Sequence, residues 1–541
     1  MKKFLSVFIA GIMALSLVAC SSGTQKQADS GRDRKGRPND EIVVSMGARI
    51  PHEFDPKDRY GMYNEAHITH STLLRRTPDL KIVGDFAKDY KISEDGLVWA
   101  FDLHDDFKFS NGELVTAEDV KFSYEMLKED GKHWDLEFID SIEVPSKNKI
   151  VFKLKSPRST FASSQLVEVP IVPKAHYDEN YKQNPIGSGP YKVVEYKPNE
   201  QAIFEINPYW HGEKPYFKKW TWVLLEENTA LASLESGEVD MIYATPEFAD
   251  KKIDGCKLFD IESNDVRGLS MPYVKKGVIN DSPDGYTVGN NVTSDPIIRK
   301  ALNIGMDRRK VVDTVLNGHG KPAYSVIDGT SFWNSEAIIE DNKPEEAKKI
   351  LDENGWVVGK DGIREKDGIK AEFELYYPTQ DQIRTNVAVE AANQAKELGI
   401  NIKLVGSNWD EMITKSHEVA LLYAGGRHNP NQFFESHHPS TAGKGWTNIT
   451  FYNNPKVTEY LEKAMNSSDL EEANKYWKLA QWDGNVGASV KGDIANVWLA
   501  RINHTYLGDS RINVGNQGMH SHGHDWALIA NISEWKWEES K

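Results

Sequence analysis

The stretch Ala371-Glu-Phe-Glu-Leu-Tyr-Tyr377 is followed by a helical pattern from Arg384 to Leu398 and then by Ile400-Asn-Ile-Lys-Leu-Val405. The first and last runs are short and mostly apolar, which is typical of strands. A strand, a helix and a strand in this order predict a βαβ unit with parallel strands. The fold class is therefore expected to be α/β.

Polar residues follow the next strand of this predicted sheet. The apolar run Val419 to Tyr423 predicts a buried strand, and the conformational freedom of Gly425-Gly426 ends it. Open α/β sheets place their ligands just beyond the carboxyl ends of such strands. Arg427 can clamp a carboxylate there, and we expect Asn429 and Asn431 to offer hydrogen bonds.

Three imidazoles lie in the same stretch, and imidazole is a ligand for transition metals. They belong to His428, His437 and His438. A simpler interpretation stays open, in which the two glycines form an ordinary turn and the adjacent histidines lie in a solvated loop.

Composition limits the classes of function. The 541 residues suffice for more than one domain, and a net charge of −16 argues against a nucleic-acid binder, which usually shows a basic face. The only basic cluster, Arg32 to Arg37, is short. The chain has no Gly-x4-Gly-Lys-Ser/Thr loop, His417-Glu418 lacks the second histidine of a zincin, and Gly187-Ser-Gly189 lacks the hydrolase spacing. We therefore expect a protein that is not an enzyme.

The N-terminus has the pattern of a secretory signal, with Lys2-Lys3 before an apolar run from Phe4 to Ala19. The run ends in Leu17-Val-Ala-Cys20, which resembles a bacterial lipobox and implies cleavage before Cys20 and lipidation of its thiol. The expected organisation is a signal peptide over residues 1–19 and a polar tether over 20–40. The protein would then be anchored to the cell membrane on its extracytoplasmic face. The one remaining cysteine, Cys256, is expected to be a structural thiol.

Short motifs continue in a fixed order along the rest of the chain. They resemble those of the family 5 extracellular solute-binding proteins, the peptide/nickel receptors of ABC importers. The motifs are Ser93-Glu-Asp-Gly96, Trp99-Ala-Phe-Asp-Leu103, Phe109-Ser-Asn-Gly112, Thr116-Ala-Glu-Asp-Val-Lys-Phe-Ser-Tyr-Glu125, Pro185-Ile-Gly-Ser-Gly-Pro-Tyr191, Asn207-Pro-Tyr-Trp210, Ala301-Leu-Asn-Ile-Gly-Met-Asp-Arg308, Pro344-Glu-Glu-Ala-Lys348, Leu351 and Gly355-Trp356.

The resemblance implies a type II periplasmic-binding-protein fold, with two lobes, a hinge and an extra β-rich subdomain. The first lobe is expected to comprise residues 41–72, 205–290 and 497–541, the subdomain 73–204, and the second lobe 291–496. The polar segment 275–291 is expected to be either a crossing between the lobes or a surface insertion.

The expected ligand type follows from one position at which this chain differs from the peptide-binding members of the family. Peptide-binding members usually carry an acid in the loop after the Val419–Tyr423 strand, which pairs with the peptide amino group, whereas this chain has Arg427. An arginine there favours a ligand that presents a carboxylate, unless Arg427 pairs with an acid of the protein. Nickel-type members bind metal as a complex with a small chelator and use aromatic residues and often one histidine of this region. Tyr423 and His437 or His438 resemble those positions.

Two further segments resemble the nickel-type branch. Lys132-His133-Trp134 resembles a pocket segment in which Trp134 would stack on the ligand, with His133 beside it. That branch also has an arginine in the segment matching Glu168-Val-Pro170, which this chain lacks. In the tail, His520, His522 and His524 alternate and would share one face of an extended segment. They are either metal ligands or a structural mark of the branch.

These features favour a substrate-binding lipoprotein that captures a metal chelate for an ABC permease and ATPase. Nickel, cobalt or zinc would arrive with an organic chelator, and no permanent cofactor is expected. We expect a monomer that binds the membrane only through its lipid. One alternative is an oligopeptide receptor of the same family, and another is a sensory or chaperone-like surface lipoprotein without a transport partner.

Overall fold

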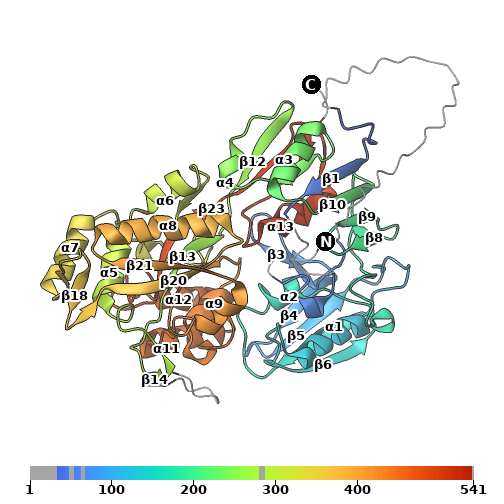
Figure 1. Cartoon of the computed structure of the whole chain (residues 1–541). Coiled ribbons are helices and arrows are strands. Elements are labelled where there is room, and N and C mark those ends of the chain that lie inside the picture. Colours follow the sequence, from blue (N-terminus) through green and yellow to red (C-terminus); the bar gives the residue numbers. More distant parts are fainter. Residues whose placement is uncertain (1–32, 48–53, 63–66, 280–286, 539–541) are drawn as a thin grey trace, which may run out of the picture.

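The computed structural model describes residues 33–47, 54–62, 67–279 and 287–538 (Figure 1). The predicted signal peptide and the lipidated Cys20 lie outside the described residues. Among the described residues, no helix combines the length and the apolar character that crossing a bilayer requires.

The predicted βαβ unit is confirmed. Strand β20 (Glu372–Pro378) pairs in parallel with β21 (Asn401–Ser407), and helix α8 (Gln382–Glu397) joins them. The predicted neighbour is β22 (Ala420–Gly425), which pairs in parallel with β20 on its other side. Three more strands, β13 (Val266–Ser270), β23 (Asn496–Ile502) and β16 (Gly320–Pro322), complete a six-stranded sheet in the order β16-β23-β13-β22-β20-β21.

Helices surround this sheet and bury its apolar residues in several cores, the largest of which includes residues of α5 to α8. Two helices follow Asp295, and Asp307 caps the second. Helix α7 ends before Gly355, whose φ of +83° favours glycine. The helices of this half are α5 (Pro296–Gly305), α6 (Arg308–Val315), α7 (Pro344–Glu353), α8, α9 (Trp409–Lys415), α10 (Asn431–His437), α11 (Pro455–Met465) and α12 (Leu470–Gln481).

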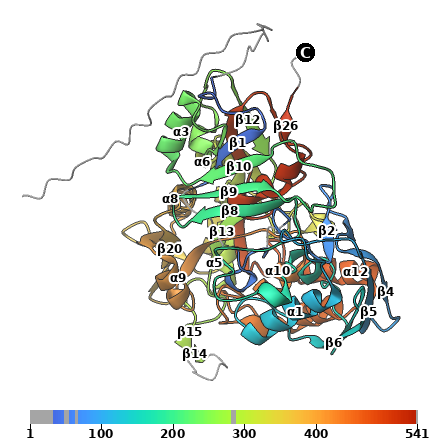
Figure 2. The same cartoon turned by 90° about the vertical axis from the view of Figure 1, so that its right-hand side faces the viewer.

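A second, seven-stranded sheet lies beside the half of the molecule that contains the six-stranded sheet (Figure 2). Its strand order is β12-β24-β11-β1-β10-β9-β8. Its strands are β1 (Glu41–Ser45), β8 (Tyr191–Lys197), β9 (Gln201–Ile206), β10 (Lys219–Val223), β11 (Met241–Tyr243), β12 (Cys256–Ile261) and β24 (His504–Asp509). Helices α3 (Glu227–Ser236), α4 (Pro246–Ala249) and α13 (His524–Ala527) accompany it. Its core is aromatic, with the rings of Phe204 and Trp220 stacked at 3.9 Å.

A four-stranded antiparallel sheet forms a third part, in the order β4-β5-β7-β6. Its strands are β4 (Ala87–Ile92), β5 (Val98–Leu103), β6 (Ile139–Ser146) and β7 (Lys149–Leu154). Helix α1 (Ala117–Asp130) covers it and begins with a capping pair, in which Thr116 N donates to Asp119 Oδ2 at 2.9 Å. Helix α2 (Gln165–Glu168) and the hairpin of β2 (Leu74–Arg76) and β3 (Ile82–Gly84) lie nearby.

Sheet membership departs from the expected domain boundaries in three places. Strands β8 and β9 pair with β10 in the seven-stranded sheet instead of belonging with β4 to β7. Strand β13 belongs to the six-stranded sheet although it precedes residue 291, and β23 runs on to Ile502 in that sheet. Alternating strands look alike in sequence, and only their pairing assigns them to a sheet.

The chain passes between the two larger sheets at two adjacent points, from β12 to β13 and from β23 to β24. The two crossings are bonded together, since Ile502 N donates to Asp265 O at 2.8 Å and Ser263 Oγ to Ile502 O. The segment 275–291 is therefore not a crossing. Its described residues include a hairpin of β14 (Val278–Ile279) and β15 (Thr287–Val288), which fits the alternative of a surface insertion. Small strands complete the fold: β17 (Val357–Val358), β18 (Arg364–Lys366), β19 (Ile369–Lys370), β25 (Ile512–Asn513) and β26 (Lys536–Trp537).

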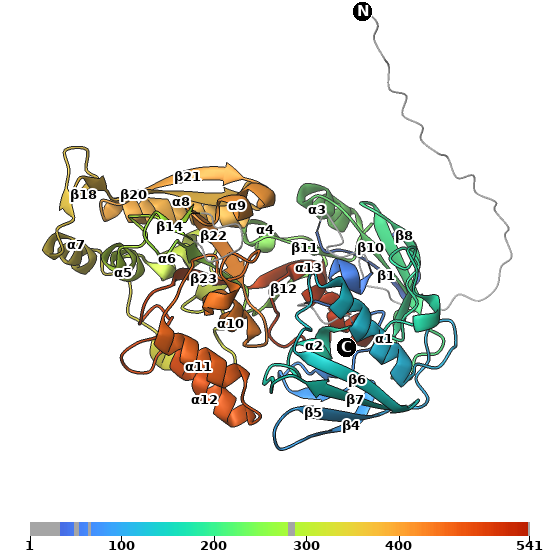
Figure 3. The ribbon, with the colours of Figure 1, turned by 90° about the horizontal axis from the view of Figure 1, so that it is seen from below.

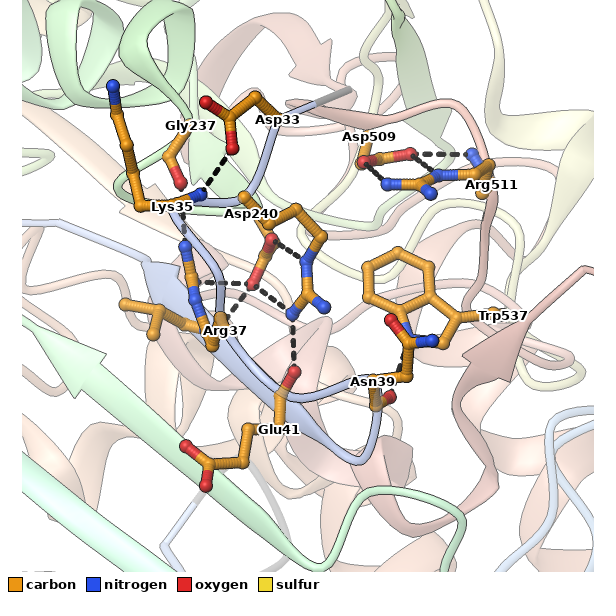
Figure 4. Close-up of polar contacts among 12 residues, drawn as sticks. Asp33, Lys35, Arg37, Asn39, Glu41, Gly237, Asp240, Asp509, Arg511 and Trp537 are labelled. Carbon is orange, nitrogen blue, oxygen red and sulfur yellow. Dashed lines mark hydrogen bonds and ion pairs between the residues drawn. The ribbon is translucent and has the colours of Figure 1, made fainter. Parts of the chain in front are cut away.

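Two arginines of the basic cluster near the N-terminus, Arg34 and Arg37, are bound within the molecule (Figure 4). Arg34 Nε and Arg37 Nη1 each lie 2.8 Å from a carboxylate oxygen of Asp240, which is 1% exposed. The Arg34 guanidinium also lies 4.5 Å from the centre of the Trp537 ring. These contacts join the N-terminal segment to the C-terminal one and occupy the charges of both arginines.

Candidate ligand-binding site

The loop after β22 is tightly enclosed by the strand crossing. Gly426 has a φ of +131°, and a Cβ atom there would lie 2.0 Å from Asn264 O. Its own carbonyl accepts a hydrogen bond from His522 N at 2.7 Å, and Arg427 O accepts one from Asn264 Nδ2 at 2.9 Å. The glycine is therefore required by close packing, and the loop joins the crossing to the C-terminal histidine segment. In Figure 3, β22 and α10 lie on the side of their half that faces the rest of the chain.

Arg427 pairs with an acid of the protein. Its Nη1 lies 3.0 Å from Glu435 Oε2, and the two side chains are 17% and 22% exposed. Asn431 Nδ2 donates to the other oxygen of Glu435 at 2.6 Å. The structure thus contains the intramolecular pairing that the sequence left open, and an incoming carboxylate would have to compete with Glu435.

Asn429 and Asn431 face the part of the chain that carries the four-stranded sheet. Asn429 Nδ2 lies 3.4 Å from Glu168 Oε1, and Asn431 Oδ1 lies 3.4 Å from Arg158 Nη2. Both asparagines are buried, at 2% and 4% exposure. These contacts hold the loop against α2 and its neighbourhood.

The three imidazoles proposed as metal ligands do not gather into one metal site. Nδ1 of His437 lies 2.8 Å from Phe433 O in its own helix, and burial lowers the pKa of His437 to about 4. Nδ1 of His438 lies 2.7 Å from Ser440 Oγ. Within the described ranges, no three His, Cys, Asp or Glu side chains are arranged to hold a metal ion, His428 included.

Trp134 is a core residue rather than an open stacking surface. It is 6% exposed, packs in the core of the third part, and its indole N–H donates to Pro56 O at 2.8 Å. His133 beside it is exposed, and partial burial lowers its pKa. A buried indole with a satisfied N–H is held by its packing, so Trp134 has no face free for a ligand in this structure.

Tyr423 lies near two tryptophan rings and the buried guanidinium group of an arginine. The Tyr423 hydroxyl donates to Trp446 O at 3.0 Å, and the Trp446 and Trp409 rings meet edge to face at 5.6 Å. The Arg384 guanidinium lies 4.6 Å from the centre of the Trp409 ring. Arg384 is 7% exposed, and its Nε has no hydrogen-bond partner among the described residues. Burial and then the positive charge of Arg267 lower the pKa of Arg384 to about 10.

Arg267 and Asp265 form a buried ion pair at the strand crossing. Arg267 contacts Asp265 Oδ1 through Nη1 and Oδ2 through Nη2, the latter at 3.3 Å. The Arg267 Nε, like that of Arg384, has no partner among the described residues. Burial opposes the charge of Asp265, but Arg267 and His522 outweigh it and hold the pKa of Asp265 well below its usual range. Two buried cations that repel one another are thus balanced by Asp265 and Asp381.

Of the three histidines of the tail, His522 contacts Asp265, and the other two contact different residues nearby. His522 Nδ1 lies 2.6 Å from Asp265 Oδ1. His520 is buried with its Nδ1 3.2 Å from that of His504, and burial lowers the pKa of His520 well below its usual value. His524 stacks on Tyr243 with ring centres 3.7 Å apart, and although burial opposes it, Asp525 raises the pKa of His524. The three alternating side chains therefore have three different environments.

Sequence reasoning missed the residues with the strongest electrostatic features. Arg384 is the third residue of α8, in the first turn after the N-cap Asp381, and Arg267 lies in a short strand between Val266 and Gly268. An arginine within a fully buried strand was a signal that could have been used, since unpaired charges are rarely buried. Tyr423 is the one predicted residue that the structure places beside this pair of arginines.

Comparisons with known proteins agree on one family. The model of the bacterial extracellular solute-binding proteins, family 5, matches residues 81–448. Protein XP55 of Streptomyces lividans is 30% identical over 93% of this chain and 90% of its own length. The oligopeptide-binding protein AppA of Bacillus subtilis is 27% identical, over 87% of this chain and 90% of its own.

A solved structure confirms the architecture. NikZ from Campylobacter jejuni in complex with Ni(L-His) has a TM-score of 0.77 and 24% identity, over 92% of this chain and 100% of its own. At this identity the likeness concerns the fold. The predicted α/β fold, with two lobes joined by a hinge and an extra β-rich subdomain, is confirmed.

Proposed function

Because the chain belongs to the family 5 bacterial extracellular solute-binding proteins, we propose that it captures a carboxylate-bearing metal chelate and delivers it to an ABC permease. The metal would be nickel or a similar ion, and it would be cargo held by an organic chelator. Members of this family are transport receptors and not enzymes, so the chemistry to be explained is recognition and release.

The observation that carries the proposal is the environment of Arg384. Its guanidinium lies on the Trp409 ring and beside Tyr423, with the Nε lacking a hydrogen-bond partner among the described residues. Arg384 Nη1 lies 3.1 Å from Asp381 Oδ2, but the buried Nε still needs an acceptor, because an unsatisfied charged donor is costly. A chelator carboxylate would meet that need while the flat rings of Tyr423 and Trp409 contact its body.

The relatives support an anionic chelate. NikZ was solved with Ni(L-His), and histidine carries a carboxylate as well as an imidazole. In this chain, His522 lies on Asp265, next to Arg267. We propose that a His522 imidazole can complete the coordination of a chelated metal. The His522 side chain is 35% exposed, whereas His437 is 1% exposed and its Nδ1 is bonded within α10.

Arg427 has a second role in this proposal. Glu435 holds it at 3.0 Å, so Arg427 would contact a ligand only by exchanging one carboxylate for another. Asn429 contacts Glu168, and Asn431 contacts Arg158, so both asparagines join the loop after β22 to the part that carries the four-stranded sheet. These contacts would couple ligand binding to closure of the lobes. We propose that the permease prefers this closed form and that the monomer is held at the membrane through the lipid on Cys20.

An oligopeptide receptor is the second candidate. Peptide-binding members usually carry an acid in the loop after β22, and in this chain two acids lie near that loop in the folded structure. Glu168 is 7% exposed and lies against Asn429, and Glu435 lies beside Arg427. Either carboxylate could pair with the amino group of a peptide. The similarity to AppA, named for oligopeptide binding, also supports this candidate.

Equilibrium dialysis separates the two candidates. The chain without residues 1–22, which keeps every described residue, would be dialysed against nickel, nickel with L-histidine, and nickel with L-histidine plus a peptide pool. Metal is then counted by mass spectrometry. We expect about one nickel per chain only when histidine is present, with no displacement by peptides. Displacement by peptides, or equal retention of nickel without histidine, would contradict the proposal.

A further inference from the structure

A large cavity lies away from Arg384 and Tyr423. Its volume is about 980 Å³, within the range of small-molecule sites. Its walls come from the β2–β3 hairpin, the loop after Trp210 and the C-terminal segment, and His428 and His520 form the side nearest the loop after β22. We call it the basic cavity because of the cations described next.

Three cations of the basic cavity form no ion pair among the described residues. They are Arg75 of β2, Lys214 of the loop and Lys536 of β26, and within the described ranges none of them makes an ion pair or a side-chain hydrogen bond. Two other exposed lysines are paired by contrast, Lys88 with Asp105 at 3.1 Å and Lys218 with Asp40 at 2.6 Å. In a chain of net charge −16, three unpaired cations from three separate segments around one cavity are an unusual arrangement.

The acids of the cavity do not cancel these charges. The charge of Asp85 interacts with that of Arg75 without forming an ion pair. Asp85 also accepts a hydrogen bond from Thr72 N at 2.7 Å and lies 3.9 Å from His67 Nδ1, so its carboxylate is shared with other groups of the wall. Glu213 and Glu534 are exposed. The cations therefore remain available to an anion that enters.

A buried hydroxyl in the wall also lacks a partner. Ser71 is 2% exposed, and its Oγ makes no hydrogen bond among the described residues. A buried polar group without a partner costs free energy, and a ligand atom in the cavity would remove that cost. The remaining wall offers amides, including Asn513 and Gln517, and the exposed ring of Tyr216.

We propose that the basic cavity is a second binding site, which takes a small organic anion with two or more carboxylate or phosphate groups. Arg75, Lys214 and Lys536 would bind the anionic groups from three sides, and Ser71 would donate a hydrogen bond. This site is separate from the one that contains Arg384, so it goes beyond the proposed transport function.

The test is calorimetric titration of the chain lacking residues 1–22 with citrate and with inorganic phosphate at low ionic strength. The cavity variant is Arg75→Gln with Lys536→Gln. The matched control is Lys88→Gln with Lys218→Gln, which removes the same charge from paired surface lysines. We expect at least one probe to bind the wild type, with affinity at least 10-fold lower in the cavity variant and within twofold in the control.

Two more variants keep the result interpretable. Ser71→Ala removes a partnerless hydroxyl, so it should fold normally and bind the probe several-fold more weakly. Arg384→Gln should leave probe binding unchanged, which separates this site from the proposed transport site. Absence of binding by both probes, or equal weakening in the cavity variant and its control, would overturn the proposal.

Discussion

The imidazole Nδ1 of His522 lies 2.6 Å from Oδ1 of Asp265, a carboxylate that is 3% exposed at the crossing between the two larger sheets. The other oxygen of Asp265 lies 3.4 Å from His504 Nε2, and Arg267 contacts both oxygens. One buried carboxylate therefore joins the crossing strands β13 and β24 to the C-terminal segment.

Replacing Asp265 by Asn should destabilise the protein strongly. The change leaves the Arg267 charge buried without its counter-ion, a loss on the order of 3–5 kcal/mol. Urea unfolding followed by tryptophan fluorescence would measure it. Asp260→Asn is the matched control, because Asp260 also pairs with a histidine but is 34% exposed, and we expect a much smaller loss there. Equal losses would contradict a central role for Asp265.

The same carboxylate predicts a pH dependence. Its pKa lies well below the usual range in the folded chain, so its contribution to the free energy of unfolding is present above about pH 4, the unfolded value. That contribution is lost as the pH falls below about 4. Wild type should therefore lose more stability than Asp265→Asn between pH 5 and pH 3, as measured by urea midpoints. Parallel loss in both proteins would count against the assignment.

Asp328 should produce the opposite trend. Burial raises its pKa to about 7, and its Oδ1 has no hydrogen-bond partner among the described residues. A carboxyl whose pKa is raised by folding stabilises the folded state below its unfolded value of about 4, and this contribution is lost as the pH rises to about 7. Asp328→Asn should therefore lose less stability than wild type between pH 5 and pH 8, by a few kcal/mol. Identical pH profiles would show that Asp328 titrates normally.

Variants of the Arg427–Glu435 pair test whether Arg427 contacts the ligand or has a structural role alone. Glu435→Gln should free the Arg427 guanidinium and raise the affinity for a nickel–histidine chelate several-fold, whereas Arg427→Ala should lower it. Calorimetric titration of the two variants measures both effects. If neither substitution changes the affinity by more than twofold, Arg427 acts within the loop alone and has no contact with the ligand.

The N-terminal arginines should contribute to stability. Asp240 is 1% exposed and binds both Arg34 and Arg37 (Figure 4). Arg34→Ala removes one of two counter-ions and a ring contact with Trp537, so we expect a loss on the order of 2–3 kcal/mol in urea unfolding. Lys218→Ala, at an exposed pair with Asp40, is the control and should change little. A loss in the control as large as that of Arg34→Ala would contradict this view.

Local patterns predicted the fold well where one element follows another. The strand–helix–strand unit from Glu372 to Ser407 has the parallel pairing that its order implies. Sheet membership could not be predicted in the same way. Strands β8 and β13 alternate like other strands, and they join their sheets through partners far away in the sequence.

The sequence placed parts of the candidate site in the fold, and their role in binding stays a prediction. Tyr423 and the loop after β22 lie where the strand order placed them, but Trp134 is buried and Arg427 is paired with Glu435. The guanidinium groups of Arg267 and Arg384 come together from segments more than a hundred residues apart. Such a pairing depends on tertiary packing, which no single motif encodes.

The most direct test of the central claim is a melting-temperature titration of wild type and Arg384→Gln, both lacking residues 1–22. Nickel with L-histidine, each component alone, and a peptide pool would be added in turn. A ligand that binds only the folded state raises the melting temperature. The account predicts a rise for wild type that needs metal and histidine together and that Arg384→Gln abolishes. A rise with peptides alone, or one that survives in Arg384→Gln, would contradict it.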